Sequence, residues 1–357
     1  MRKRVFLKSP VLEYGTPGSV RGRSGQPAVL PRCPTSGLRA VRAEFFRKGG
    51  GPMNTVNQSE RFRGCLLGLA VGDAVGTTLE FRTRGTFEPL MDMVGGGPFR
   101  LQPGQWTDDT SMALCLATSL VERGGFDADD QMRRYCQWVN SGYLSSTGFC
   151  FDIGNTVAAA LRRYQSDGNA YAGSIDPQAA GNGCIMRLAP IPMYFFPDLD
   201  AVERWAGDSS RTTHGTEECI DACRLLGRII CRALLGRPKD EVVFGDSESF
   251  VSGERIAALA VGAYRGKSEA QICGSGYVVQ SLEAALWAFD RTDSFADAIL
   301  TAANLGDDAD TTAAVCGQIA GAYYGEPHIP SRWLERVALR SEITALADRL
   351  GAKRLTC

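Results

Sequence analysis

Two short acidic motifs precede apolar, alanine-rich runs of the sequence. Residues 107–110 read Thr-Asp-Asp-Thr, and residues 308–311 read Asp-Ala-Asp-Thr. Asp and Thr are common helix N-caps, so each motif can simply satisfy the free N–H groups of a helix's first turn. One carboxylate is enough for that task. The surplus of carboxylate and hydroxyl oxygens equally favours a site for a hard cation such as Mg²⁺ or Mn²⁺, and the residues alone leave both interpretations open.

Other candidates for acid or base chemistry are few. Glu80 follows the glycine-rich segment 67–79, whose glycines predict close helix packing. Its position fits a solvated residue at a helix end at least as well as an acid or base beside metal ions. His214 and His328 are the only histidines, and no GxSxG nucleophile elbow is present. Neither acidic motif continues with the spaced ligands of an EF-hand loop.

Net charge and composition exclude several classes of protein. The 357 residues hold 39 Lys and Arg against 40 Asp and Glu, so a field suited to nucleic acid or to a membrane surface is not expected. Residues 1–52 hold 11 of the basic residues and two acidic ones. The remaining chain is therefore acidic, which suits a protein that gathers carboxylates around a metal.

The cysteines predict neither zinc binding nor a disulfide framework. Twelve cysteines are spread along the chain, many within apolar runs, and no CxxC pair occurs. We expect reduced, mostly buried thiols. No secretory signal and no apolar run of about 18 residues is found, so a cytoplasmic protein is expected.

A helical pattern of apolar residues covers nearly all of the chain after residue 52. Residues 1–52 are rich in Arg, Gly and Pro and predict a disordered leader, either a transit peptide or sequence upstream of a true start at Met53. Residues 53–357 predict one compact all-α domain, an orthogonal helical bundle in which both acidic motifs line one metal-bearing cleft. Its expected helices cover 60–75, 110–123, 127–140, 153–166, 217–236, 252–264, 278–289, 294–304, 311–324 and 332–350.

Six segments, taken in order, resemble the ADP-ribosylglycohydrolase family. A match to one segment arises easily by chance, whereas six in sequence are specific, and the resemblance runs from about Glu60 to the C-terminal region. Cys184 stands where a small residue such as Ser is expected. The segments are Gly72-Asp73-Ala74 leading to Glu80, Thr107-Asp108-Asp109, Phe151-Asp152-Ile153-Gly154-Asn155-Thr156, Gly181-Asn182-Gly183-Cys184-Ile185-Met186-Arg187, Thr213-His214-Gly215 and Asp308-Ala309-Asp310-Thr311.

This resemblance implies an all-α hydrolase with two Mg²⁺ or Mn²⁺ ions that cleaves the bond between ADP-ribose and a modified protein side chain, arginine being the first choice. Asp307 has no ligand role in it. The implied metal ligands are Thr107, Asp108, Asp109, Asp308, Asp310 and Thr311. The implied catalytic residues are Glu80, Asp109 and Asp308. The implied substrate-binding residues are Asp152, Gly154, Asn155, Asn182, Gly183 and His214, and we hypothesise that backbone N–H groups of the Gly181–Gly183 turn hold the diphosphate.

Two other functions remain open at this stage. The same site can act on a small ADP-ribosylated metabolite such as O-acetyl-ADP-ribose. A non-catalytic ADP-ribose-binding or structural member of the family is the third possibility, because fold alone does not guarantee activity.

Overall fold

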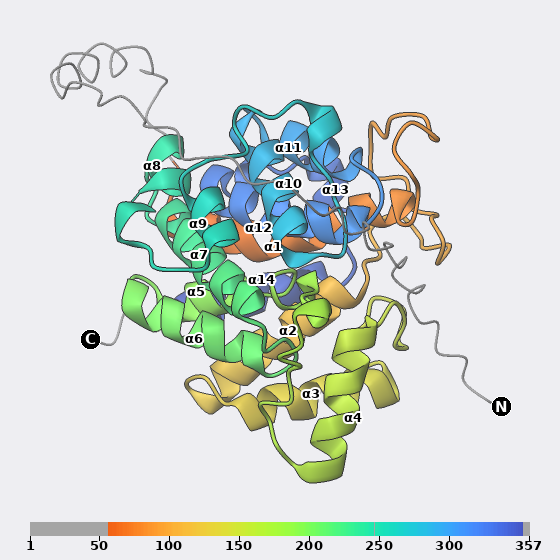
Figure 1. Cartoon of the computed structure of the whole chain (residues 1–357). Helices are drawn as coiled ribbons and strands as arrows, with labels where there is room; N and C mark the ends of the chain where they lie inside the picture. The colour runs from red at the N-terminus through yellow and green to blue at the C-terminus, as the bar shows by residue number, and fades with distance from the viewer. Residues whose placement is uncertain (1–55, 246, 353–357) are drawn as a thin grey trace, which may run out of the picture. The chain divides into compact units, whose positions relative to one another are not determined.

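The structure, a computed structural model, describes residues 56–245 and 247–352. The leader predicted for residues 1–52 and the start predicted at Met53 lie outside the described residues. Within these ranges the chain forms helices and connecting loops, with three isolated β-bridges and no strand (Figure 1). The prediction of an all-α fold is therefore confirmed.

The α-helices are spread over the whole described chain. In order they are α1 (Gln58–Gly76), α2 (Asp108–Arg123), α3 (Ala128–Ser141), α4 (Asn155–Asp167), α5 (Pro190–Phe195), α6 (Leu199–Arg211), α7 (Glu217–Leu234), α8 (Lys239–Phe244), α9 (Glu254–Ala260), α10 (Val278–Asp290), α11 (Phe295–Ala303), α12 (Ala309–Tyr324), α13 (Ser331–Leu334) and α14 (Arg340–Gly351). Short 3₁₀ turns are η3 (Thr77–Leu79), η4 (Pro177–Ala179), η5 (Asn182–Cys184), η6 (Ser247–Ser249), η7 (Glu269–Gln271) and η8 (Glu326–His328).

Two differences from the predicted helices have physical causes. The single helix expected over 332–350 is wrong: α13 ends early and Leu339 turns the chain with a φ of 54°. Ala338 instead donates its N–H to the carbonyl oxygen of Gly104 and accepts from the indole of Trp106, so tertiary partners replace helix bonds there. The sequence analysis also missed α6, although its N-cap Asp198 is a standard start signal.

Helices α1 and α12 lie side by side and form the centre of the described fold (Figure 1). Four glycines spaced every fourth residue along α1 make this approach possible. A methyl group added to any of them would lie 2.1–2.3 Å from a backbone oxygen of α12, far inside van der Waals contact. The two helices are antiparallel. The residues that meet are Gly64 with Gly321, Gly68 with Gly317, Gly72 with Ala313 and Gly76 with Ala309. The end of α1 therefore meets the beginning of α12.

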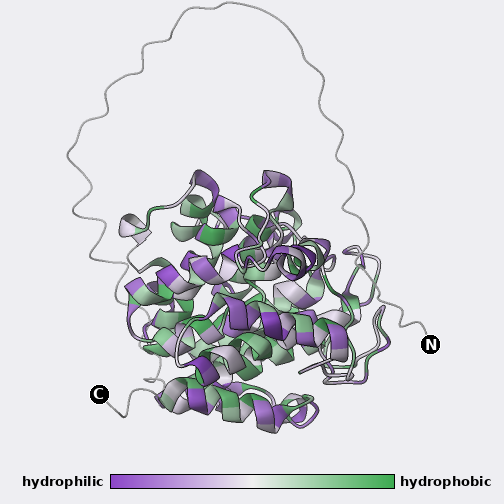
Figure 2. Ribbon diagram, turned by 90° about the horizontal axis from the view of Figure 1, so that it is seen from below, coloured by the Kyte–Doolittle hydropathy of each residue, from purple (hydrophilic) through white to green (hydrophobic). Residues whose placement is uncertain are grey.

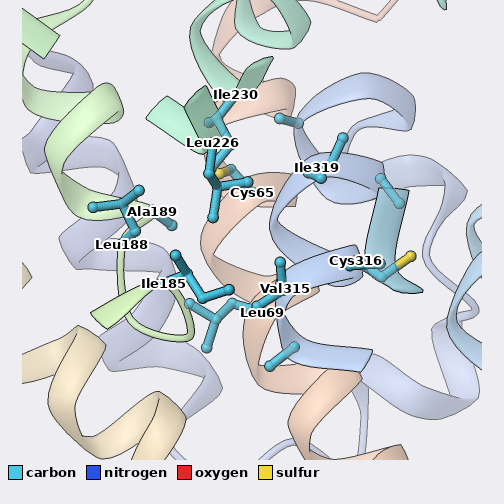
Figure 3. Packing of buried hydrophobic residues seen from close by; sticks show 14 of the residues in the cluster. Cys65, Leu69, Ile185, Leu188, Ala189, Leu226, Ile230, Val315, Cys316 and Ile319 are labelled. Carbon is cyan, nitrogen blue, oxygen red and sulfur yellow. The ribbon is translucent and has the colours of Figure 1, made fainter. Parts of the chain in front are cut away.

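Apolar side chains from several helices surround this central pair. Figure 3 shows Cys65 and Leu69 of α1 together with Leu226 and Ile230 of α7 and Val315 of α12. All of them are buried. Figure 2 shows green and purple residues in close succession on many of the helices. The two central helices α1 and α12 differ in being buried along almost their whole length. Such a core holds the helix ends that carry the acidic motifs.

The cysteines behave as the sequence predicts within the described chain. Every described cysteine is a free thiol, and most are buried, including Cys65, Cys231 and Cys316. No described helix combines the length and the apolar character that crossing a bilayer requires.

Candidate active site

Helix α1 supplies the first carboxylate of the site, Asp73, which holds the start of α2. Its Oδ1 accepts hydrogen bonds from the N–H and the hydroxyl of Thr107, both at 2.9 Å. Its Oδ2 accepts from the N–H of Thr110 at 3.1 Å and from the Thr110 hydroxyl at 2.6 Å. All three side chains are buried. Asp73 therefore caps α2 from a neighbouring helix.

The segment just after α1 does the same for α12. Oε2 of Glu80, which is buried at the end of η3, accepts a hydrogen bond from the N–H of Ala309 at 3.0 Å. The N-cap residues of α2 and α12 are Thr107 and Asp308, and neither caps its own helix through its side chain. Capping alone therefore does not explain the two acidic motifs, because carboxylates of a third segment perform that task.

With their helices capped from outside, the two motifs contact each other. The hydroxyl of Thr107 lies 3.3 Å from Oδ2 of Asp310, and the hydroxyl of Thr311 lies 3.3 Å from Oδ1 of Asp109. These four side chains are buried. Residues some 200 positions apart in the sequence thus form one oxygen-lined group, as the sequence analysis expected.

The loop before α4 adds another carboxylate, Asp152. Carboxylate oxygens of Glu80, Asp152 and Asp310 all lie within 4.8 Å of one another, and the three side chains are buried. Glu80, Asp152 and Asp310 have three different predicted roles, which are catalysis, substrate binding and metal binding. The structure places them in one cluster.

Backbone strain is concentrated around this cluster. Phe81, Asp152 and Asp307 have φ values of 61°, 58° and 57°. Left-handed conformations of such residues cost roughly 1–3 kcal/mol each and persist only where surrounding contacts enforce them. Here the N–H of Phe81 donates to the carbonyl of Asp307, and the N–H of Asp307 donates to the carbonyl of Arg82, each at 2.8 Å. This clamp fixes Glu80 against the start of α12.

A wall beside the second motif consists of glycines, Asn182 and His214. The Asn182 amide donates to Oδ2 of Asp308 at 3.1 Å, which ties this wall to the second motif. A methyl group at Gly183 would lie 2.8 Å from the imidazole of buried His214, so the glycine makes room for the ring. Burial lowers the pKa of His214 to about 4, and the imidazole is therefore neutral near pH 7.

One part of the sequence-based hypothesis needs correction at this wall. The N–H of Gly181 donates to the carbonyl of Ala179 at 2.8 Å, and the N–H of Asn182 donates to the carbonyl of Gly276 at 3.0 Å. These two amides are already engaged and do not offer a diphosphate a ready pair of donors. Gly154 and Asn155, at the start of α4, are more accessible, and Asn155 is exposed.

The donor set of the cluster suits hard cations. Its atoms are carboxylate and hydroxyl oxygens, and no histidine or cysteine of the described chain joins them. Burial, followed by the charge of Asp310, raises the pKa of Asp73 to about 7. Pooled buried carboxylates repel one another in this way unless cations offset their charge. These residues therefore fit Mg²⁺ or Mn²⁺, which prefer oxygen ligands.

The sequence analysis assigned no role to Asp73, the carboxylate that positions Thr107 and Thr110. A buried acid inside an apolar, glycine-rich helix was the available signal, because such a group needs several hydrogen bonds. Asp307, for which the resemblance implied no ligand role, contributes backbone hydrogen bonds to the clamp.

Comparisons with known proteins identify the family of this chain. The sequence model of the ADP-ribosylglycohydrolase family matches residues 54–356, which include every residue of the cluster. The chain belongs to the ADP-ribosylglycohydrolase family. The ADP-ribosylarginine hydrolase Tri1 of Serratia proteamaculans is 44% identical over 323 residues, covering 90% of this chain and 87% of that protein.

Two further relatives of this ADP-ribosylglycohydrolase extend the comparison. The ADP-ribosyl-[dinitrogen reductase] glycohydrolase of Rhodospirillum rubrum is 34% identical, covering 79% of this chain and 92% of its own. A solved structure titled ADP-ribosylglycohydrolase-related protein complex superposes with a TM-score of 0.72 at 42% identity, covering 83% of this chain and 98% of that chain. Fold and family therefore agree.

Proposed function

We propose that the protein removes ADP-ribose from modified arginine side chains and so reverses mono-ADP-ribosylation. The names of the Tri1 relatives from Serratia proteamaculans and Pseudomonas putida, ADP-ribosylarginine hydrolase, support this substrate. One observation carries the catalytic part. Asp73 and Glu80 cap α2 and α12 from outside, which leaves the oxygens of both acidic motifs to meet in one buried group.

The cofactors in this proposal are two Mg²⁺ or Mn²⁺ ions held by Thr107, Asp108, Asp109, Asp308, Asp310 and Thr311. Support comes from the all-oxygen donor set and from the contacts between the two motifs. When bound, such ions supply positive charge that orients ribose hydroxyls and lowers the pKa of a water molecule. Asp73 keeps Thr107 in place as an outer partner.

The reaction is hydrolysis at the anomeric carbon of the distal ribose. The bond from this carbon to the arginine nitrogen breaks, and its electron pair stays on nitrogen. Water adds its oxygen to the carbon, and one water proton ends on the released guanidino nitrogen. Glu80 is the proposed proton carrier, assisted by Asp109 and Asp308, because it is a buried member of the cluster and the clamp fixes its backbone.

The remaining predicted residues bind ADP-ribose in this proposal. Asn182, Gly183 and His214 form a neutral wall beside Asp308, and Asp152 contributes to the cluster itself. Gly154 and Asn155 provide backbone and amide groups at the accessible start of α4. A nucleotide that carries two phosphates meets little additional negative charge along the neutral wall.

The direct test is release of free ADP-ribose from a protein modified on arginine. The full-length chain is assayed with Mg²⁺, with Mn²⁺ and after chelation, and we expect release only with metal. Glu80→Gln should lose about 100-fold or more in turnover, and Glu88→Gln, on an exposed residue, serves as its control. Binding of ADP-ribose without release from arginine would indicate a different leaving group, such as serine or acetate.

A further inference from the structure

Four phenylalanine rings form a continuous row that we call the phenylalanine ridge: Phe81, Phe99, Phe151 and Phe149. Neighbouring ring centres lie 6.2 Å apart between Phe81 and Phe99, 5.3 Å between Phe99 and Phe151, and 5.9 Å between Phe151 and Phe149. Phe81 and Phe99 lie in the connection between η3 and α2, and Phe149 and Phe151 lie in the connection between α3 and α4. Their spacing is that of interacting aromatic pairs, so the ridge is one surface.

Two residues of the ridge are chain neighbours of cluster carboxylates, and the rings at both of its ends are exposed. Phe81 directly follows Glu80, and Phe151 directly precedes Asp152, two of the three cluster carboxylates. Phe81 is 48% exposed and Phe149 is 56% exposed, whereas Phe151 is buried. Exposed rings of this size are unfavourable in water unless a partner covers them. A ligand that leaves the cluster along this side therefore passes over aromatic faces.

Hydrogen bonds fix the backbone at both ends of the ridge. The backbone of Phe81 is clamped to Asp307 by the hydrogen bonds described above. The carbonyl of Phe149 accepts from the Ser145 hydroxyl at 2.7 Å, and Ser146, in the same loop, donates to the carbonyl of Trp106 at 2.6 Å. Trp106 immediately precedes the first acidic motif. The position of the ridge is thus set by the segments that build the site.

Cations of the chain already cover other phenylalanine rings. Arg224 lies over Phe250, Lys239 over Phe289 and Arg265 over Phe244, with 4.1–5.2 Å between charge and ring centre. Among the described residues, no comparable Arg or Lys contact involves the ridge. Its faces are therefore available to a cation from outside the chain.

We propose that the phenylalanine ridge receives the arginine leaving group, its guanidinium lying over the rings as the bond to ribose breaks. This inference rests on the proposed function. A planar guanidinium stacks well on aromatic faces. The carboxylates of Glu80 and Asp152, which neighbour Phe81 and Phe151 in the chain, favour a positive charge. The ridge residues determine specificity for the leaving group.

Geometry favours the leaving group over the nucleobase as the occupant. With the distal ribose at the cluster, its two substituents must depart in different directions. The neutral wall of Asn182 and His214 contacts the second acidic motif through Asp308 and suits the nucleotide arm. The leaving group is still attached to a protein and needs an exit open to solvent. The ridge ends in the exposed ring of Phe149 and supplies that exit.

Phe149→Leu tests the proposal because it keeps an apolar side chain and removes the aromatic face. We would measure binding of agmatine to the full-length protein with Mn²⁺ and saturating ADP-ribose, which requires no turnover. We would also measure kcat/KM on arginine-modified protein and binding of ADP-ribose alone. Agmatine affinity and kcat/KM should each fall about fivefold, and ADP-ribose affinity should not change. Phe149→Trp should restore both, and Val261→Ala, at an exposed site elsewhere, is the matched control.

The outcomes separate this proposal from the function on which it rests. Wild-type protein that binds agmatine through Phe149 but releases no ADP-ribose would contradict arginine hydrolysis and keep the ridge as a guanidinium site. Normal hydrolysis with equal agmatine affinity in wild type and Phe149→Leu would overturn the ridge proposal alone. An equal loss of ADP-ribose affinity would also overturn it, because the ridge would then hold the nucleotide.

Discussion

The two aspartate motifs are similar in sequence, but the chain holds them differently. Motif 107–110 is buried and bound through four hydrogen bonds to one carboxylate, Asp73. In motif 308–311, Asp308 is only partly buried and contacts the neutral amide of Asn182. The first motif is therefore held firmly in place by Asp73. The second motif lies beside the wall that we propose to bind substrate. The groups around each motif, and not its sequence, account for this difference.

The largest effect on stability is expected from a substitution between α1 and α12, because the packing of these two helices aligns the two motifs. A methyl group in Gly72→Ala would lie 2.1 Å from the carbonyl oxygen of Ala313, and backbone cannot yield cheaply there. We expect a loss of at least about 3 kcal/mol in the free energy of unfolding, measured by denaturant titration. Gly125→Ala is the control, since no atom lies within 4 Å of its added methyl group. Equal stability of both variants would contradict close packing of α1 on α12.

Asp310 belongs to the second motif but also contacts Thr107 of the first, so its loss should damage both. Asp310→Asn should lower metal-dependent turnover about 100-fold or more, because even outer partners of a metal site are worth 10- to 100-fold. Asp308→Asn should act similarly. Helical circular dichroism should change little in either variant.

Asp307→Asn provides the matched control for these two substitutions. It alters a neighbouring carboxylate that has no proposed ligand role, and asparagine tolerates the φ of 57° found there. Turnover close to wild type is expected for this control. Retained turnover in both Asp308→Asn and Asp310→Asn would overturn the metal assignment.

Asp73 supports the first motif through the four hydrogen bonds described above. In Asp73→Asn an NH₂ group replaces one of two oxygens that accept from N–H groups of α2, so two donors would oppose each other. We expect Mn²⁺ affinity, measured by isothermal titration calorimetry, to fall about 10- to 100-fold. Unchanged affinity would mean that the first motif does not need its support.

Sequence reasoning succeeded where local patterns are sufficient. Helix periodicity, the glycines of α1 and the surplus oxygens of two helix starts are all local features, and the all-α prediction followed from them. The break at Leu339 could not be predicted, because the partner of the neighbouring Ala338 is Gly104, more than 200 residues away. Asp73 was overlooked for the same reason, since its partners lie on another helix. The roles of Asp73 and Ala338 depend on which residues from distant parts of the chain lie beside them. A single sequence does not contain that information.

The smallest expected effect concerns His214, in the wall beside the second motif. It tests whether that wall is neutral, which is the proposed difference between the surroundings of the two motifs. Burial lowers the pKa of His214 to about 4, with Arg187 contributing in the same direction, whereas an unfolded histidine titrates near 6.5. Between these values the unfolded chain binds a proton that the folded chain does not. The stability contribution is therefore present above pH 6.5 and is lost as the pH falls toward 4.

Between pH 7 and pH 5.5 this loss amounts to about 1 kcal/mol. His214→Gln keeps a polar group beside Thr213 but removes the titration, so its unfolding free energy should fall less than that of wild type over this interval. Taking the difference between the two proteins cancels groups such as Asp73 that titrate in both. An equal pH dependence would mean that His214 has the same pKa in the folded and the unfolded protein, near 6.5. The wall beside Asp308 would then gain a positive charge as the pH falls below that value, and the proposed contrast between the two motifs would no longer hold.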